Sequence, residues 1–257
     1  MQGNRIAAWL AGAVVLAGVS MFAAAARSDA NALWNIVHGA CVPDQQRHGD
    51  PAPCAEVDLN DGVEAGYAVL KDRYGATQYL LIPTARVVGI ESPSLLAASA
   101  VNYFAAAWTA RRFVEQALGH AMPIDTLSLA VNSQWARSQN QLHIHIDCIR
   151  ADVRQTLENE RAAIGERWSA LAAPLAGQRY LAMRVMGQTL KQHNPFKLLA
   201  EGVPGASADM GERTLAVAGM LFDGAPGFVV VADRADLLHG DFAGGSLLQD
   251  HSCALAH

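Results

Sequence analysis

The sequence predicts an α+β domain, with helices packed on one side of an antiparallel sheet, preceded by one N-terminal transmembrane helix. Short apolar runs bounded by turn residues predict the strands, and longer stretches with apolar residues at helical spacing predict the helices. A long apolar N-terminus predicts the membrane span. We therefore divide the 257-residue chain into an N-terminal segment, residues 1–30, and one domain, residues 31–257, long enough to bury its own core.

The N-terminal segment contains an uncharged apolar run, Ile6 to Ala26, with Arg5 before it and Arg27 after it. A helix of roughly 20 apolar residues spans the hydrocarbon core of a bilayer. The pattern is typical of a signal-type sequence that places the rest of the chain beyond the membrane. A cleaved signal peptide is the alternative, because Ala23–Ala26 offers small-residue cleavage sites. The run is longer than the roughly 7 to 15 residues of a signal core, which favours an uncleaved anchor.

The composition argues against a nucleic-acid partner. The formal net charge is -5, only 17% of the residues are charged, and the lysines and arginines are scattered along the chain. Nucleic-acid binding needs a clustered positive field, which this sequence does not provide.

The four cysteines are Cys41, Cys54, Cys148 and Cys253. An even number in an exported chain favours two disulfides, in one of three pairings. Cys41 with Cys54 would close a short Pro-rich loop, which leaves Cys148 to pair with Cys253. A zinc site is the alternative, but the sequence contains no CxxC pair to support it.

Apolar runs predict the strands, and their order predicts an antiparallel arrangement. The expected strands are residues 78–83, 85–90, 127–132, 138–148, 180–185, 214–221 and 227–232. A short polar loop joins 127–132 to 138–148, which predicts a hairpin. The sequence FDGAP predicts a turn between the last two strands.

Two stretches predict helices. The first begins at Ser92, a capping residue followed by Pro93 at the first helical position, and runs through alanine-rich sequence to Gly119. The second has charged residues on one face and apolar residues at helical spacing on the other. Its apolar residues are Val153, Leu157, Ile164, Trp168 and Leu171.

The segment Ser138–Cys148, SQNQLHIHIDC, alternates polar and apolar residues. In an extended strand its polar side chains lie on one face and its apolar side chains on the other. The polar set is Gln141, His143, His145 and Asp147, and the apolar set is Leu142, Ile144, Ile146 and Cys148. The apolar face is expected to meet a core, so the polar face lines either solvent or a functional site.

Three interpretations fit the two histidines. They can lie on a solvated strand face, or they can bind a metal ion, for which His120, His193 and His251 are third-ligand candidates without diagnostic spacing. The third interpretation is nucleophilic catalysis on phosphorus, because neutral imidazole, with an ordinary pKa of about 6.5, is a good nucleophile near neutral pH.

Asn132 with the following SQNQLHIHID resembles the histidine-triad (HIT) superfamily. In that superfamily a hairpin strand carries His-φ-His-φ-His, where φ is apolar, and the middle histidine takes a nucleotidyl group. Asp147 stands here in place of the third histidine. The N-terminal apolar segment, YLLIPTARVVGIESP, SLAVNSQWARSQNQLHIHIDCIRADVR and the DHSC tail resemble one branch, the membrane-anchored bacterial CDP-diacylglycerol pyrophosphatases, from about residue 30 to the C-terminus.

The resemblance implies a HIT-like catalytic domain over residues 31–257 that takes part in phospholipid metabolism. It implies hydrolysis of the pyrophosphate bond of the membrane lipid CDP-diacylglycerol to CMP and phosphatidate through a histidine intermediate, with no cofactor or metal. It also implies a single-pass protein of the bacterial inner membrane with the catalytic domain on the periplasmic side. The residues themselves leave open a metal-dependent hydrolase with His143 and His145 as ligands, or a non-catalytic exported protein that binds a nucleotide or lipid.

Carried over by position, His145 is the attacking histidine and His143 the first histidine of the motif. Asn132 and Gln139 match polar positions that approach the nucleotide or its phosphates. Asp147, in the third position, is a further substrate-binding candidate. Four cations are candidates to reach phosphate, with a solvated surface position as the alternative for each. These are Lys71, Arg73, Arg86 and Arg137.

Overall fold

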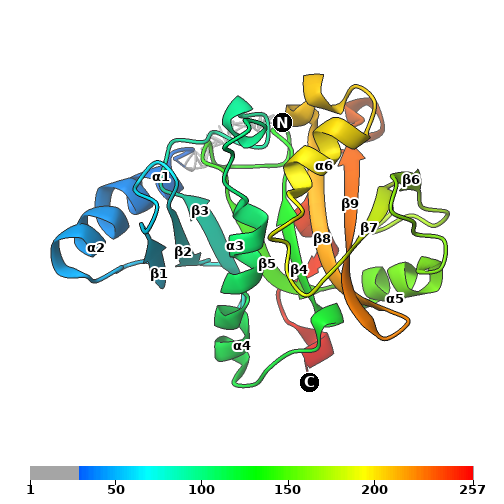
Figure 1. The fold of residues 1–257 in the computed structure, drawn as a ribbon, viewed down its shortest axis with the longest axis horizontal. Helices are drawn as coiled ribbons and strands as arrows, with labels where there is room; N and C mark the ends of the chain where they lie inside the picture. The colour runs from blue at the N-terminus through cyan, green and yellow to red at the C-terminus, as the bar shows by residue number, and fades with distance from the viewer. Residues whose placement is uncertain (1–28, 257) are drawn as a thin grey trace, which may run out of the picture.

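The computed structural model describes residues 29–256, which form one antiparallel sheet with flanking helices (Figure 1). The strand order is β1-β2-β3-β5-β4-β8-β9-β7-β6, and β10 pairs with β5. The strands are β1 (Glu56–Asp58), β2 (Tyr67–Lys71), β3 (Tyr79–Pro83), β4 (Leu127–Val131), β5 (Ile144–Ile149), β6 (Ser169–Ala170), β7 (Leu181–Met186), β8 (Arg213–Phe222), β9 (Ala225–Arg234) and β10 (Gln249–Asp250). The α+β class and the antiparallel sheet are confirmed.

The helices lie on both faces of this sheet, not on one as the sequence suggested. They are α1 (Ala32–Ile36), α2 (Val42–His48), α3 (Tyr103–Ala110), α4 (Arg112–Leu118), α5 (Ala151–Glu160) and α6 (Pro195–Gly202). A π-helical turn, Val37–Cys41, joins α1 to α2. In Figure 1, α3 and α6 lie in front of the sheet, and their apolar residues belong to the largest core cluster.

Both faces are covered because the central strands are apolar on both sides. Along β8, Leu215 and Val217 belong to the core under α3 and α6, whereas Ala216 and Ala218 belong to a second core that includes apolar residues of α5. A strand buried on both faces loses the polar alternation that marks a one-sided sheet. The sequence prediction of one-sided helix packing was therefore wrong.

The second face carries two separate apolar clusters. One lies under α1 and α2 and includes Leu80 of β3, and the other lies under α5 and includes Ala130 of β4. His145 of β5 is paired with both of these residues, so it lies on the same face and between the two clusters. Its apolar neighbours in sequence, Ile144 and Ile146, are fully buried on the opposite face. The predicted alternation along this strand is confirmed.

Most predicted strands are confirmed, including the β4–β5 hairpin and the β8–β9 turn. There are two exceptions. The strand expected over 138–148 begins only at Ile144, so that His143 directly precedes β5, and residues 85–90 form bends and a turn rather than a strand. Their apolar side chains Val87 and Ile90 are buried in the main core, and the Val87 carbonyl accepts a bond from the Leu142 amide at 2.6 Å. The apolar run reflects burial of an irregular segment that crosses the core.

The first predicted helix begins later than expected. Ser92 and Pro93 precede a short 3-10 turn, Pro93–Leu95, and α3 begins only after Asn102. The Asn102 side chain caps α3 by accepting a bond from the Ala105 amide at 3.1 Å. Asn102 therefore starts the helix that Ser92 was expected to start. Gly119 ends α4 in the left-handed conformation, as predicted.

The second predicted helix ends earlier than expected, because α5 stops at Glu160. Ile164 is still buried in the α5 cluster, but it lies in the loop that follows. Trp168 packs against the opposite core cluster. Ile164 and Trp168 are apolar because they pack from a loop, and their helical spacing from Val153 and Leu157 does not reflect a helix.

Two predictions need correction: the transmembrane helix, and the localisation of the chain as a single-pass inner-membrane protein with a periplasmic domain. Within residues 29–256, no helix is long and apolar enough to cross a membrane. The longest α-helix there, α5, has 10 residues and so extends only about 15 Å, against about 30 Å of hydrocarbon. Ile6 to Ala26, on which the prediction was based, lies outside the described residues.

Both predicted disulfides are present. Cys41 is bonded to Cys54 and Cys148 to Cys253. The second bond joins β5 to the C-terminal tail, whose strand β10 also pairs with β5. The tail is thus fixed to the strand that carries His145 and directly follows His143.

The two disulfides are expected to differ in their contribution to stability. Cys148–Cys253 spans 105 residues of chain and Cys41–Cys54 spans 13, so the first restricts the unfolded chain more. We expect the Cys148→Ala/Cys253→Ala pair to lower the free energy of unfolding by about 5 kcal/mol and the Cys41→Ala/Cys54→Ala pair by about 3 kcal/mol. Urea unfolding under non-reducing conditions measures both, and equal losses would contradict the expectation.

Candidate active site

His143 and His145 lie on the wall of a cavity of about 410 Å³. The cavity is bounded by α1, by the segment after β2 and by the loop that precedes β5. Its other lining residues are Asp29, Ala32, Leu33, Ile36, Pro53, Leu70, Lys71, Asp72, Arg73, Tyr74, Leu80, Ser138 and Gln139. The cavity occurs here because the polar side of β5 faces the space between the two apolar clusters of this face.

Amide side chains lie at both ring nitrogens of His145. The Gln78 amide nitrogen is 2.9 Å from Nδ1, and the Asn132 amide nitrogen is 3.5 Å from Nε2. The rings of His143 and His145 have centroids 4.9 Å apart and meet edge to face. His143 Nδ1 is held by the Gln141 carbonyl at 2.8 Å. Both imidazoles therefore have fixed orientations.

The orientation of the Asn132 amide is set by a third residue. The backbone amide of Ser246 donates to Asn132 Oδ1 at 3.0 Å, which turns the amide nitrogen of Asn132 toward His145. Both amides present nitrogen, which only donates, to a ring that in its neutral form accepts at one nitrogen. Because the Ser246 bond fixes the Asn132 amide, we take Nε2 as the acceptor and the Gln78 amide as the one whose oxygen and nitrogen exchange places. The Asn132 contact is long, and it leaves the lone pair on Nε2 loosely engaged.

Both histidines favour the neutral form. The pKa of His145 is held well below its usual 6.5, mainly by burial of the ring. Repulsion between a protonated His145 and positive charge on His143 and His251 lowers it further. Burial also lowers the pKa of His143, although the Gln141 carbonyl and the Asp72 carboxylate oppose the shift. At neutral pH His145 is therefore an uncharged base.

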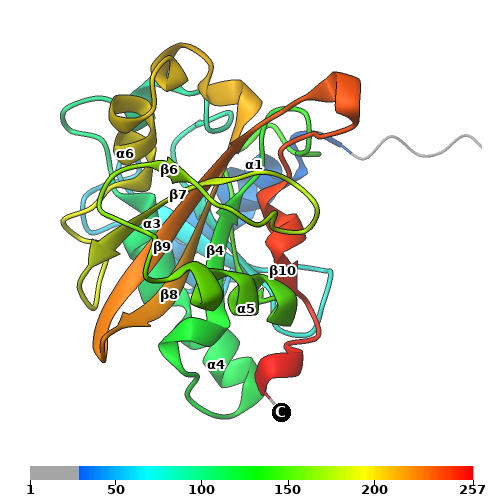
Figure 2. The ribbon, with the colours of Figure 1, turned by 90° about the vertical axis from the view of Figure 1, so that its right-hand side faces the viewer.

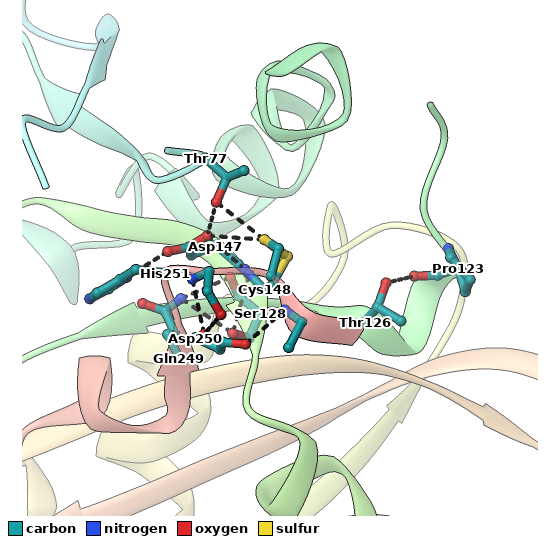
Figure 3. Close-up of a disulfide and its surroundings, with 12 residues drawn as sticks. Thr77, Pro123, Thr126, Ser128, Asp147, Cys148, Gln249, Asp250 and His251 are labelled. Atoms are coloured by element: carbon teal, nitrogen blue, oxygen red, sulfur yellow. Dashed lines mark hydrogen bonds and ion pairs between the residues drawn. A yellow bond between two sulfur atoms is a disulfide. The ribbon is translucent and has the colours of Figure 1, made fainter. Parts of the chain in front are cut away.

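Asp147 lies on the same face of β5 but is fully buried. Its Oδ1 accepts bonds from the Thr77 hydroxyl and the Cys148 amide, both at 2.9 Å, and its Oδ2 is 2.6 Å from Nδ1 of His251 (Figure 3). Burial raises the pKa of Asp147, and the bond to His251 opposes that rise. The carboxylate thus connects β5 with the C-terminal tail beside the Cys148–Cys253 disulfide.

Two of the four predicted cations reach the cavity. Lys71 and Arg73 line it. Arg137 is instead paired with both carboxylate oxygens of Glu91 at 2.6 Å, and Arg86 donates to Asn31. Glu91 is therefore engaged in an ion pair with Arg137 and does not line the cavity.

The predicted site residues take different positions. Gln139 lines the cavity, where its side chain accepts from the Leu33 amide at 3.1 Å and donates to the Asp29 carbonyl at 2.9 Å, so it also holds α1 in place. Asn132 lies beside His145 as described above. Asp147 lies under the site, with both carboxylate oxygens already bonded.

Gln78 and His251 were not predicted from the sequence. Gln78 comes directly before β3, and its contact with His145 follows from the pairing of β3 with β5, which no local motif indicates. His251 was considered only as a metal ligand, and the DHSC tail was the signal that could have identified it. Its position depends on the disulfide and on β10.

Within residues 29–256, one group of potential ligand atoms lies close enough together to surround a metal ion, with all atoms within 4.8 Å of one another: those of Asp147, Cys148 and Cys253. Both sulfurs of this group are consumed by the disulfide, so the group is a poor fit to a metal centre. His143 and His145 belong to no such group in the part of the chain that the structure describes.

Comparison with known proteins places this geometry in a family. Residues 28–257 match the family model described as CDP-diacylglycerol pyrophosphatase. The chain is also 43% identical over 226 residues to the CDP-diacylglycerol pyrophosphatase of Yersinia pestis, a match that covers 88% of this chain and 85% of that protein. The chain therefore belongs to the CDP-diacylglycerol pyrophosphatases, a family of hydrolases.

Proposed function

We propose that this chain hydrolyses the pyrophosphate bond of CDP-diacylglycerol to CMP and phosphatidate, with His145 as the nucleophile, and that it acts in phospholipid metabolism. The family and the 43% identical relative support the overall reaction. The observation that carries the mechanism is a neutral His145, oriented by amides at both nitrogens, on the wall of a cavity that also contains Lys71 and Arg73.

The first step is attack of His145 Nε2 on the phosphorus of the cytidylyl group. The bond from that phosphorus to the bridging oxygen breaks, and phosphatidate leaves with the oxygen and its electron pair. The cytidylyl group remains bonded to Nε2. Water then attacks the same phosphorus, the phosphorus–nitrogen bond breaks, and CMP leaves with the water oxygen while one water proton passes to solvent.

The attack requires the proton of neutral His145 to be on Nδ1, so that Nε2 keeps its lone pair. The Asn132 amide favours this tautomer because it presents a donor to Nε2. The Gln78 amide lies 2.9 Å from Nδ1. When its oxygen and nitrogen exchange places by a 180° rotation of the amide, its oxygen accepts the Nδ1 proton and stabilises the same tautomer. Asn132 and Gln78 therefore act as positioning residues for His145.

The two cations support the phosphates. The CDP-diacylglycerol pyrophosphate is anionic, and Lys71 and Arg73 are the cavity-lining cations. Asp72 and Asp29 line the same cavity, and they would oppose phosphate unless it lies on the side of Lys71 and Arg73. We assign Gln139 to the nucleotide side of the cavity, where it also holds α1.

Asp147 is assigned a supporting role beneath His145. Its oxygens bind Thr77, which precedes Gln78 in the chain, and His251 of the tail. It therefore fixes the segment that presents Gln78 to His145, without needing to contact the substrate. This assignment also explains how a carboxylate in the third position of the motif avoids repelling phosphate.

The first prediction concerns the nucleophile. We expect His145→Ala to reduce CMP release from CDP-diacylglycerol by at least about a thousandfold, because no covalent intermediate can form. His120→Ala, which removes an exposed histidine in the loop after α4, is the matched control. Wild-type protein quenched in alkaline denaturant, in which a phosphorus–nitrogen bond survives, should carry nucleotide on His145. Activity that disappears on chelation would favour the metal-dependent alternative, and nucleotide or lipid binding without turnover would favour the non-catalytic one.

A second prediction concerns pH. As the pH falls, His145 gains a proton and loses its lone pair, and its lowered pKa delays that loss. We expect the acidic limb of kcat/KM to lie well below pH 6.5, and nitrogen NMR of the ring to show neutral imidazole down to the same pH. Protonation of His145 by NMR at or above pH 6.5 would contradict the burial argument.

A third prediction concerns substrate phosphate. Arg73→Met and Lys71→Met should each raise KM about tenfold or more, because a charge-assisted hydrogen bond contributes about 1.5–3 kcal/mol. Arg47→Met, at an exposed arginine of α2, is the control for loss of one positive charge. An unchanged KM in both cavity variants would place the phosphates elsewhere.

A further inference from the structure

Large apolar side chains are exposed together on two short segments. Nine large apolar residues within 29–256 are exposed, and five of them fall at position 135 or within residues 237–247. These five, which we call the apolar patch, are Trp135 (49% exposed), Leu237 (45%), Leu238 (95%), Phe242 (53%) and Leu247 (58%). Scattered exposed apolar residues are ordinary, but a gathered set marks an interaction surface.

The two segments of the patch, which are far apart in sequence, come together in space. Trp135, Phe242 and Leu247 line one shallow hollow of about 400 Å³. Leu237 and Leu238 lie on the turn that leads into Phe242 and is closed by the Asp236–Asp241 bridge. This turn, which follows β9, projects beyond the body of the domain (Figure 2).

Hydrogen bonds join the patch to the proposed active site. The Ser133 side chain donates to the Phe242 carbonyl, and the Ser133 amide donates to the Ala243 carbonyl at 3.1 Å. The Ser246 amide donates to Asn132, whose own amide nitrogen lies 3.5 Å from Nε2 of His145. One side chain, Asn132, therefore separates the segment that carries the patch from the proposed nucleophile.

The chemistry of the substrate favours a lipid layer over a protein partner as the occupant of the apolar patch. In CDP-diacylglycerol the glycerol carrying both acyl chains is attached to one of the two phosphates, so the chains lie close to the bond that His145 cleaves. The chains themselves are in a lipid layer, which a projecting apolar turn can enter. A protein partner would need no such proximity to Asn132.

We propose that the apolar patch inserts into the lipid surface that carries the substrate and thereby aligns the phosphate with His145. This inference rests on the proposed function for its choice of lipid. Leu238, almost fully exposed on the projecting turn, is the residue that enters deepest. Trp135 and Phe242, nearer the site, lie at the interface between the acyl chains and the headgroup.

The test places an environment-sensitive fluorophore at Leu238→Cys in the full chain. The four native cysteines are all in disulfides, so only the new thiol is labelled under non-reducing conditions. Leu221→Cys is the matched control, because Leu221 is also an exposed leucine (46%) but lies at the other end of β8 from the site. Phosphatidylcholine vesicles should shift the emission to the blue at position 238 and leave it unchanged at position 221.

A kinetic arm uses Leu238→Ser and Leu221→Ser with two forms of the substrate. We expect Leu238→Ser to lower kcat/KM at least fivefold for CDP-diacylglycerol in vesicles, and to leave it unchanged for a dispersed short-chain form. Leu221→Ser should change neither value. Equal losses on both forms would overturn the proposal, because they would indicate damage to the site rather than to docking.

The fluorescence outcomes separate this proposal from the proposed function. No shift at position 238, or equal shifts at 238 and 221, overturns lipid docking whether or not the protein is active. A shift at 238 that appears without vesicles and grows with protein concentration overturns it in favour of a second copy of the chain. A vesicle-dependent shift in a protein that hydrolyses neither substrate would support the docking surface and reject the proposed reaction.

Discussion

The alternation of side chains along β5 is the constraint on which the site depends. This strand pairs with β3, β4 and β10, so its two faces are fixed by three neighbours. Ile144 and Ile146 are fully buried on one face, which forces His143 and His145 onto the other. A slip of one residue would exchange the two sets and bury both imidazoles in the core. The same burial that stabilises the sheet therefore places the histidines.

The C-terminal tail supports this strand from the side of the site. Cys253 is bonded to Cys148, and His251 contacts Asp147, the residue before Cys148 in the chain. The buried carboxylate would be costly without partners, and His251, Thr77 and the Cys148 amide supply them. A residue 104 positions away in the chain thus stabilises the position that the third histidine occupies in the HIT motif.

The proposed chemistry and the proposed docking surface share one side chain. Asn132 turns its nitrogen to His145 because its oxygen accepts from Ser246, in the segment that also carries Phe242 and Leu247. Movement of that segment on a lipid surface would therefore shift the Asn132 amide relative to Nε2 of His145. This connection offers a physical route by which contact with lipid and positioning of the nucleophile depend on each other.

The sequence by itself determined the α+β class, the faces of β5, the β4–β5 and β8–β9 hairpins and the number of disulfides, because these follow from period-two alternation, turn residues and cysteine parity. The structure decided the pairing of the cysteines, of which the sequence allowed three. It identified His143 and His145 as a pair through the same alternation. Only the tertiary structure decided that Gln78 and His251 join the site, because strand pairing and the tail bring them there from distant positions. It also decided where the helices begin and end, since burial of loop residues such as Ile164 mimics helical spacing.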